Sequence, residues 1–384
     1  MKTTRRGFVG TIALGAAAGA VTGTSPFGKR AGAQTREAAR SGIYDGGVIQ
    51  LNQNESARGP GPKTIQAIQA HTNKRMGRGY SPDHVNELRA VVADYYEVGT
   101  DNVQLATGST PLLQGSVRAF CSATKGFVTP MPTYSTSLST ARRIGAKTTE
   151  VDLDSSLAID LDLLAEASRG AGLVYFCNPN NPTGMVHGPG AVERFVRRVL
   201  RESPDTVIHV DEAYINYARP GSIETAVPLA LENEHVFVTR SFSKAHGIAG
   251  LRVGYALARQ QTLARIRDAW GLGDVNMLGA IAAITAFEDM EHIDWEVREN
   301  AEIRDGVIAA FRDMGFDVPD SNTNHIFVNI RRPAQEFREA CLERKVLVGR
   351  DFPPLHTTHC RISIGSRKEM AAAMKVFREV LTRG

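Results

Sequence analysis

The feature that most constrains the fold of this chain is a series of short, continuously apolar segments separated by helix-length segments. An apolar run without polar alternation is typical of a strand that is buried on both faces. Such strands, alternating with helices such as Pro111–Ala123 and Gly190–Glu202, form a mostly parallel sheet with helices on both sides. The sequence therefore predicts an α/β fold whose strands are Val103–Ala106, Phe127–Thr129, Leu173–Cys177, Val207–Val210, Val236–Thr239 and Val253–Leu257.

The regular alternation of short apolar strands and helices ends near residue 290, which indicates a second domain. A long helical stretch, Thr262–Ala286, precedes the change. We therefore predict an N-terminal arm at residues 34–61, a large domain at 62–289 and a smaller α+β domain at 290–384. The smaller domain is predicted to contain helix Asp294–Met314, strand His325–Asn329, helix Ala334–Arg344, strand Arg361–Ile364 and helix Lys368–Thr382.

The first 33 residues are typical of an export signal. The pair Arg5-Arg6 precedes an apolar stretch at residues 8–21, and small residues at 31–33 form a cleavage motif. The arginine pair resembles a twin-arginine leader, which is read by the twin-arginine (Tat) translocase and carries folded, often cofactor-loaded proteins. We expect cleavage after Ala33 and a periplasmic or extracellular protein. An uncleaved membrane anchor is the alternative, but a spanning helix needs about 20 apolar residues, so no stable anchor is expected.

Charge and cysteine content exclude several other classes of protein. The formal charge is +4, but five basic and no acidic residues lie within residues 1–33, so the remainder carries −1 and no nucleic-acid partner is expected. Four cysteines without a C-x-x-C pair argue against a metal site or a disulfide scaffold. Two of them, Cys177 and Cys360, lie in apolar runs and are predicted to be core residues.

Polar groups follow five of the predicted strands in turn. Ligands of open α/β sheets bind outside the carboxyl ends of the strands. Because the five groups would all lie at that edge, the sequence predicts one shared site. The groups are Gly108-Ser109-Thr110, Tyr134, Asn178–Gly184, Asp211–Tyr214 and Ser241–Lys244.

Two of these residues have a chemistry that is specific when they occur together. A lysine at the mouth of a sheet loses hydration, and its amine then becomes a nucleophile that forms Schiff bases; an exposed loop lysine is the alternative for Lys244. A carboxylate after an apolar strand, here Asp211, is either a helix N-cap or a buried charge. Beside a pyridine nitrogen, such a charge keeps the nitrogen protonated, as pyridoxal phosphate (PLP) chemistry requires.

The other polar groups each have a binding role and a structural alternative. The turn and helix start at Gly108–Pro111 favour phosphate binding, although a plain capped helix has the same pattern. Arg252 could bind the same phosphate or form a surface ion pair. Asn181 could donate to a ring hydroxyl or belong to a tight turn, and Tyr134 could stack on a ring or fill the core. Arg361 lies on a buried type of strand and needs an anionic partner, such as a substrate carboxylate.

The set of motifs, in this order, resembles the fold-type I, class I/II aminotransferases, and among them the histidinol-phosphate aminotransferase branch. The resemblance extends over about residues 50–380. The segments that carry it are Leu51–Pro60, Gly79–Asp83, Gly108-Ser109, Pro132–Tyr134, Asn178–Gly184, Val210–Tyr214, Ser241–Lys244, Gly250–Gly254 and Arg361–Gly365.

The resemblance implies a role for each motif residue. Lys244 would form the Schiff base with PLP and shuttle a proton, Asp211 would pair with the ring nitrogen, and Tyr214 and Asn181 would contact the ring hydroxyl O3′. Tyr80 would reach the phosphate of a neighbouring subunit, which implies a homodimer. The remaining cofactor contacts would be Gly108, Ser109, Thr110, Ser241 and Arg252 at the phosphate and Tyr134 at the ring, and the substrate contacts would be Arg361, Asn54 and Arg350.

The activity implied by the resemblance is transfer of an amino group between an amino acid or small amine and a 2-oxo acid, through pyridoxamine phosphate. A decarboxylase, lyase or oxidase on the same scaffold is one alternative, and a PLP-binding protein without turnover is another. The export signal departs from the branch, whose pathway is cytoplasmic. Histidinol phosphate itself is therefore not assigned as the substrate.

Overall fold

The computed structural model describes residues 47–78, 80 and 83–382. The contacts within the chain divide it into residues 1–48 and 49–384, and every element below belongs to the second unit. The predicted signal, its cleavage site and the first part of the predicted arm, residues 34–46, lie outside the described residues.

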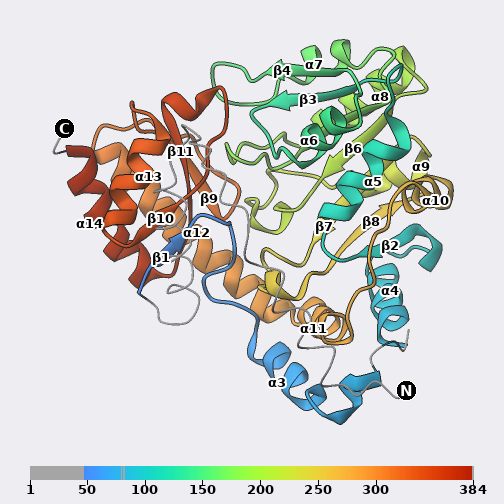
Figure 1. Cartoon of the computed structure of the whole chain (residues 1–384), viewed down its shortest axis with the longest axis horizontal. Coiled ribbons are helices and arrows are strands. Elements are labelled where there is room, and N and C mark those ends of the chain that lie inside the picture. Colours follow the sequence, from blue (N-terminus) through green and yellow to red (C-terminus); the bar gives the residue numbers. More distant parts are fainter. Residues whose placement is uncertain (1–46, 79, 81–82, 383–384) are drawn as a thin grey trace, which may run out of the picture. The chain divides into compact units, whose positions relative to one another are not determined.

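A seven-stranded sheet forms the centre of this unit, with the strand order β2-β8-β7-β6-β5-β3-β4 (Figure 1). Neighbouring strands are parallel except that β8 runs antiparallel to both β2 and β7. The predicted, mostly parallel α/β sheet is thus confirmed. Its strands are β2 (Val103–Ala106), β3 (Phe127–Met131), β4 (Thr148–Asp152), β5 (Leu173–Cys177), β6 (Val207–Asp211), β7 (Val236–Ser241) and β8 (Gly254–Ala258).

The edge strand β4 escaped prediction because its sequence, Thr-Thr-Glu-Val-Asp, is polar and only partly buried. The central strands are different. Successive residues of β5 point to opposite faces, so Val174 and Phe176 join one hydrophobic cluster while Leu173, Tyr175 and Cys177 join another. Both faces are therefore apolar, which is why this strand reads as a continuous apolar run.

Helices cover both faces of the sheet. The helix α8 illustrates the local cause: Val192, Phe195, Val196 and Val199 recur at helical spacing and are all buried against the sheet. One face is covered by α4 (Asp83–Tyr95), α7 (Leu161–Ala167), α8 (Ala191–Glu202), α9 (Val227–Glu232) and α11 (Met277–Glu288), on which α3 (Pro62–His71) packs. The other face is covered by α5 (Thr110–Phe120), α6 (Thr136–Arg143) and α10 (Gln260–Ala269).

The single helical stretch predicted over Thr262–Ala286 is wrong, because two helices, α10 and α11, occupy it. The segment between them contains Gly273, whose φ of 71° is strained for residues with a side chain and where a Cβ would collide with the Thr107 side chain. Asn276 then caps α11 by accepting the Gly279 N–H at 2.7 Å. Both stop and start signals were present in the sequence.

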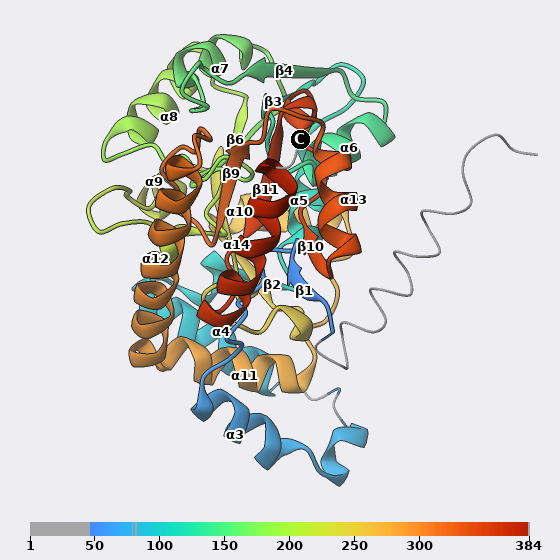
Figure 2. The same cartoon turned by 90° about the vertical axis from the view of Figure 1, so that its left-hand side faces the viewer.

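The C-terminal residues form a second hydrophobic cluster around short strands (Figures 1 and 2). Strands β9 and β11 pair antiparallel, and β1 (Ile49–Leu51) pairs in parallel with β10. Leu51 is fully buried in this cluster, so this part of the predicted arm is a strand attached to the C-terminal region. The elements are α12 (Met290–Asp313), β9 (His325–Asn329), α13 (Ala334–Glu343), β10 (Val346–Val348), β11 (His359–Ser363) and α14 (Arg367–Thr382).

Short 3₁₀ helices connect several of these elements, at Lys74–Arg78, Thr100–Asn102, Ile215–Tyr217, Ala249–Leu251 and Leu355–Thr357. Across the described residues, no helix is both long and apolar enough to span a bilayer.

The strand register determines which side chains meet at the carboxyl edge of the sheet. Asp211 pairs with Cys177 on one side and Thr239 on the other, and Ser241 pairs with Gly254. Because β8 is antiparallel to β7, the beginning of β8 lies at the carboxyl edge of β7. This reversal brings Arg252, which precedes β8, to the same edge as the residues that follow β6 and β7.

Candidate active site

Lys244 follows β7 and is partly buried at the carboxyl edge of the sheet. Its Nζ donates to the carbonyl oxygens of Asn54 at 3.0 Å and Gln53 at 3.4 Å, and it lies 5.3 Å from the centre of the Tyr214 ring. Burial, and secondarily the positive charge of Arg361, lower the pKa of the Lys244 amine to about 8. The amine is therefore far more nucleophilic near neutral pH than an exposed lysine.

Asp211 is the last residue of β6 and is 3% exposed. Its Oδ2 accepts the Tyr175 hydroxyl at 3.1 Å, and its Oδ1 accepts the Thr239 hydroxyl at 3.1 Å. The Ala213 N–H adds a longer bond of 3.3 Å. Burial raises the pKa of Asp211 to about 6, against the opposing effect of these donors. The carboxylate is ionised at neutral pH and can hold a protonated ring nitrogen.

The predicted phosphate site lies where α5 begins. Gly108 adopts φ 81° against the Arg252 guanidinium, so a side chain at position 108 would occupy the space between them. Ser109 precedes α5 without capping it, which leaves its hydroxyl available, and Thr110 is the first helical residue. Ser241 accepts the Ser243 N–H at 3.1 Å nearby. Free N–H groups of a helix start, hydroxyls and a guanidinium are the donors that a phosphate requires.

Tyr214 and Asn181 meet on the other side of the site. The Asn181 Nδ2 donates to the Tyr214 hydroxyl at 3.2 Å, and the Asn54 Nδ2 donates to the same oxygen at 3.0 Å. Burial raises the pKa of Tyr214, so its hydroxyl keeps its hydrogen. With two N–H donors already on the oxygen, that hydrogen remains available to another acceptor.

Two arginines come to this site from the C-terminal region. Arg361 lies within β11, two residues after the strand begins, and is 4% exposed. It donates to Asn181 Oδ1 at 2.9 Å and to the Asn52 carbonyl, while its Nε is buried without a partner among the described residues. Burial lowers its pKa to about 10. Arg350 lies against the rings of Tyr134 and Phe352, 5.5 and 5.2 Å from their centres.

The structure thus brings together the predicted residues from both ends of the chain, with one exception. The Tyr80 side chain is fully exposed in the single chain and lies outside this cluster. Asn54 lies within the cluster, but its side chain contacts protein groups. Tyr175, Thr239 and His325 also border the site and were not predicted, because only the strand register and the packing of distant loops place them there.

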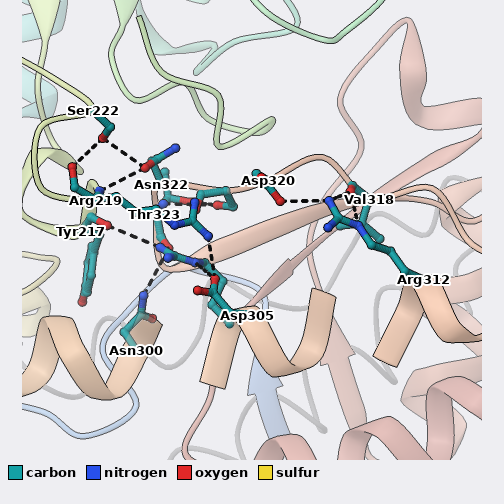
Figure 3. A network of polar contacts seen from close by, with 12 residues as sticks. Tyr217, Arg219, Ser222, Asn300, Asp305, Arg312, Val318, Asp320, Asn322 and Thr323 are labelled. Carbon is teal, nitrogen blue, oxygen red and sulfur yellow. Dashed lines mark hydrogen bonds and ion pairs between the residues drawn. The ribbon is translucent and has the colours of Figure 1, made fainter. Parts of the chain in front are cut away.

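A polar network fastens the segment after Tyr214 to the loop before β9 (Figure 3). The Arg219 N–H donates to Asn322 Oδ1 at 3.1 Å, and the fully buried Arg304 of α12 donates to the carbonyls of Tyr217 and Thr323 at 3.4 and 3.3 Å. These hydrogen bonds join the loop before β9 to the segment that leaves the sheet edge after Tyr214.

These residues fit PLP and offer no metal centre. Within the part of the chain that the structure describes, no group of three or more His, Cys, Asp or Glu side chains is arranged to hold a metal ion. Lys244 would bind the cofactor covalently, Asp211 its ring nitrogen, and Ser109, Ser241 and Arg252 its phosphate. When bound, PLP supplies an electron-withdrawing ring that stabilises negative charge on the substrate carbon. The chain's own residues would orient the ring, hold its nitrogen protonated through Asp211 and present the Lys244 amine for proton transfer.

A buried carboxylate and a lysine amine at the carboxyl edge of this sheet are the arrangement expected of a fold-type I PLP-dependent enzyme. The aminotransferase class I and II family model matches residues 46–377. Histidinol-phosphate aminotransferase from Gluconacetobacter diazotrophicus is 32% identical over 343 residues, which cover 88% of this chain and 92% of that protein. Aromatic amino acid aminotransferase from Nocardia farcinica is 32% identical over 331 residues, covering 84% and 89%.

Among solved structures, histidinol-phosphate aminotransferase from Sinorhizobium meliloti, in complex with pyridoxal-5'-phosphate, has a TM-score of 0.81 at 24% identity. The match covers 95% of this chain and 96% of that one, and it shows the shared fold. The chain belongs to the class I and II aminotransferases. It is a PLP-dependent aminotransferase, as the sequence motifs predicted.

The pKa of Lys244 gives a testable pH dependence. Only the unprotonated amine attacks an aldehyde, so apoprotein mixed with PLP should acquire visible absorbance faster as the pH rises, with a midpoint near 8. Stopped-flow absorbance between pH 6 and 10 measures this rate. The control Lys63→Ala removes an exposed lysine and should leave the midpoint unchanged. A midpoint near that of an exposed lysine would contradict the prediction.

Proposed function

We propose that the mature protein is an exported, homodimeric aminotransferase for an amino acid or small amine that carries an anionic group. The observation that carries the catalytic part is the placement of the Lys244 amine and the Asp211 carboxylate at one sheet edge. A ring held by both would present its reactive carbon to the amine.

The substrate class is inferred from Arg361 and Arg350. Arg361 is buried, and its Nε lacks a partner among the described residues, which suits a carboxylate or phosphate oxygen. Arg350 lies beside the rings of Tyr134 and Phe352, a surface that suits an aromatic or a second anionic group. Relatives named histidinol-phosphate and aromatic amino acid aminotransferases are compatible with either.

Half-transamination tests the reaction class. An amino donor should bleach the visible absorbance of the PLP-loaded protein and release one 2-oxo acid per site, because the amino group stays on the cofactor. Lys244→Ala should lose both the covalent absorbance and turnover, whereas Lys63→Ala should retain them. Release of CO₂ or peroxide would instead support another reaction class. Binding of PLP without conversion of any donor in a broad panel would support a non-catalytic protein.

The homodimer is proposed from Tyr80 and its surroundings. Tyr80 is fully exposed in the single chain, and Ile65, Met76 and Tyr95, nearby in sequence, are 42%, 44% and 56% exposed. Apolar side chains that gather in one part of the chain favour a protein interface. At the interface, Tyr80 would serve the phosphate site of the neighbouring subunit, as the resemblance implies.

Subunit complementation tests this arrangement. A Tyr80→Ala chain retains its own Lys244 but lacks the tyrosine that would contact the phosphate in the neighbouring subunit. A Lys244→Ala chain lacks the lysine but retains Tyr80. In co-expressed mixed dimers, one of the two sites is intact, so random pairing should restore about a quarter of the wild-type sites. Activity should appear in the mixture above the sum of the two variants made separately. Equal activity in the mixture and in that sum would argue against sharing of Tyr80.

Export is proposed from the leader sequence. Folding closes Lys244 into a site built from both ends of the chain, so PLP would be bound before a folded protein crosses the membrane. The arginine pair at residues 5 and 6 is the feature that a translocase for folded proteins would read.

The export proposal predicts the location of a leader variant. Arg5→Lys with Arg6→Lys keeps the charge and changes only the guanidinium geometry, so the protein should remain in the cytoplasm, active and PLP-loaded. Lys2→Arg is the matched control and should be exported normally. Cell fractionation with an activity assay measures both. Unchanged export of the double variant would exclude a twin-arginine signal, and activity held in the membrane fraction would indicate an uncleaved anchor.

A further inference from the structure

His325 is a buried histidine at the active site to which the motifs assign no role. It is the first residue of β9 and is fully buried. Its Nδ1 lies 2.9 Å from the Nδ2 of Asn54, and its ring meets the Tyr214 ring edge-on with 5.1 Å between centres. The histidine therefore contacts both Tyr214 and the residue that donates to the Tyr214 hydroxyl.

The hydrogen bonds around Asn54 determine which ring nitrogen carries the proton. Ser363 accepts the Asn54 backbone N–H at 2.9 Å and donates its hydroxyl to Asn54 Oδ1 at 2.7 Å. The amide nitrogen therefore faces the other way, and its two hydrogens go to the Tyr214 oxygen and to His325 Nδ1. His325 Nδ1 is thus an acceptor, and the ring carries its hydrogen on Nε2.

The surroundings keep this ring neutral. Burial is the main cause that lowers the pKa of His325, and the cations Arg361, Lys244 and Arg304 act in the same direction. The Pro182 carbonyl acts in the opposite direction. A proton on Nδ1 would also face an amide hydrogen of Asn54. The neutral acceptor is therefore the state that the site maintains.

Asn54 connects His325 to both reactive groups of the site. Its backbone has φ 55°, a conformation that asparagine tolerates better than most residues, and it is 1% exposed. Its carbonyl accepts the Lys244 Nζ at 3.0 Å, while its side chain donates to Tyr214. A rotation of the Asn54 amide would therefore remove a donor from Tyr214 beside the Lys244 amine.

We propose that His325 is a positioning residue for the aminotransferase reaction, because its Nδ1 fixes the Asn54 amide that orients the Tyr214 hydroxyl. The inference rests on the role of Tyr214 in the proposed function. The Tyr214 oxygen accepts one N–H from Asn54 and one from Asn181, so its own hydrogen points away from both. That hydrogen is the one that would stabilise a negatively charged oxygen on the cofactor ring.

Two substitutions separate positioning from space filling. His325→Phe keeps an aromatic edge against Tyr214 and removes the acceptor. His325→Asn removes the ring but places a carbonyl oxygen near the position of Nδ1. Positioning predicts that the Phe variant is impaired and that the Asn variant is close to wild type, whereas space filling predicts the opposite order.

The main readout is the pH titration of the visible absorbance of the bound cofactor. In His325→Phe the ring oxygen loses its oriented donor, so the midpoint should move to higher pH. Its kcat/KM should fall about tenfold, the factor expected from the loss of one ordinary hydrogen bond. His325→Asn should stay within about twofold of wild type on the same scale. A Phe variant with an unchanged midpoint, or an Asn variant as impaired as Phe, would overturn the proposal.

Three further variants make the result unambiguous. In a Tyr214→Phe background, His325→Phe should cause no further shift of the midpoint, because the effect passes through the Tyr214 hydroxyl. His359→Phe is the matched control, since His359 lies at the other end of the β9–β11 sheet with its ring stacked on Phe327. If Phe is not tolerated at position 325, Ser363→Ala removes the hydroxyl that donates to Asn54 Oδ1 and should shift the midpoint in the same way. An unchanged midpoint in Ser363→Ala would overturn the proposal.

The wild type separates this proposal from the function on which it rests. Wild-type protein without Lys244-dependent visible absorbance would contradict the proposed function. Normal wild-type absorbance together with an unshifted His325→Phe variant would contradict only the role of His325.

Discussion

The negative charge of Asp211 lies buried at the end of a central strand, and the neighbouring strands are arranged to hold it there. Burying an unpaired carboxylate destabilises the folded state, and each hydrogen-bond donor that reaches the carboxylate offsets part of that free-energy cost. The donors come from the two neighbouring strands, Tyr175 from β5 and Thr239 from β7. The strand order β5-β6-β7 and its register are therefore conditions for the chemistry, because a shift of one residue would turn both hydroxyls to other positions.

The same edge of the sheet also determines where the cationic groups lie. Lys244 follows β7. Because β8 runs antiparallel to β7, Arg252, which precedes β8, lies at the same edge of the sheet as the end of β7. Burial, and secondarily the nearby positive charge of Arg361, lower the pKa of the Lys244 amine to about 8. A carboxylate that remains charged and an amine that readily loses its charge thus occupy two different environments at the ends of two neighbouring strands, β6 and β7.

Elements whose limits are set by neighbouring residues in the chain could be predicted from the sequence. The central strands are apolar throughout because both of their faces are covered, so Leu173–Cys177 was predicted with its observed bounds. The edge strand β4 was missed because it has only one neighbour and keeps polar side chains. The break between α10 and α11 could have been read from Gly273 and Asn276. The contribution of His325 could not, since it requires knowing that the start of β9, 271 residues away from Asn54 in the sequence, lies against it.

The segment before α3 completes the site by linking the two regions that supply it. Leu51 is buried in the C-terminal cluster, and Arg58 makes a bidentate pair with the fully buried Glu296 of α12. Between these two anchors, the Asn52 carbonyl accepts Arg361 and the Asn54 carbonyl accepts Lys244. The groups expected to bind the substrate and the cofactor are thus hydrogen-bonded to carbonyls only two residues apart on one anchored segment. Because Arg361 and the Lys244 amine are held by the same short segment, the position of each depends on how residues 52–54 are anchored at Leu51 and Arg58.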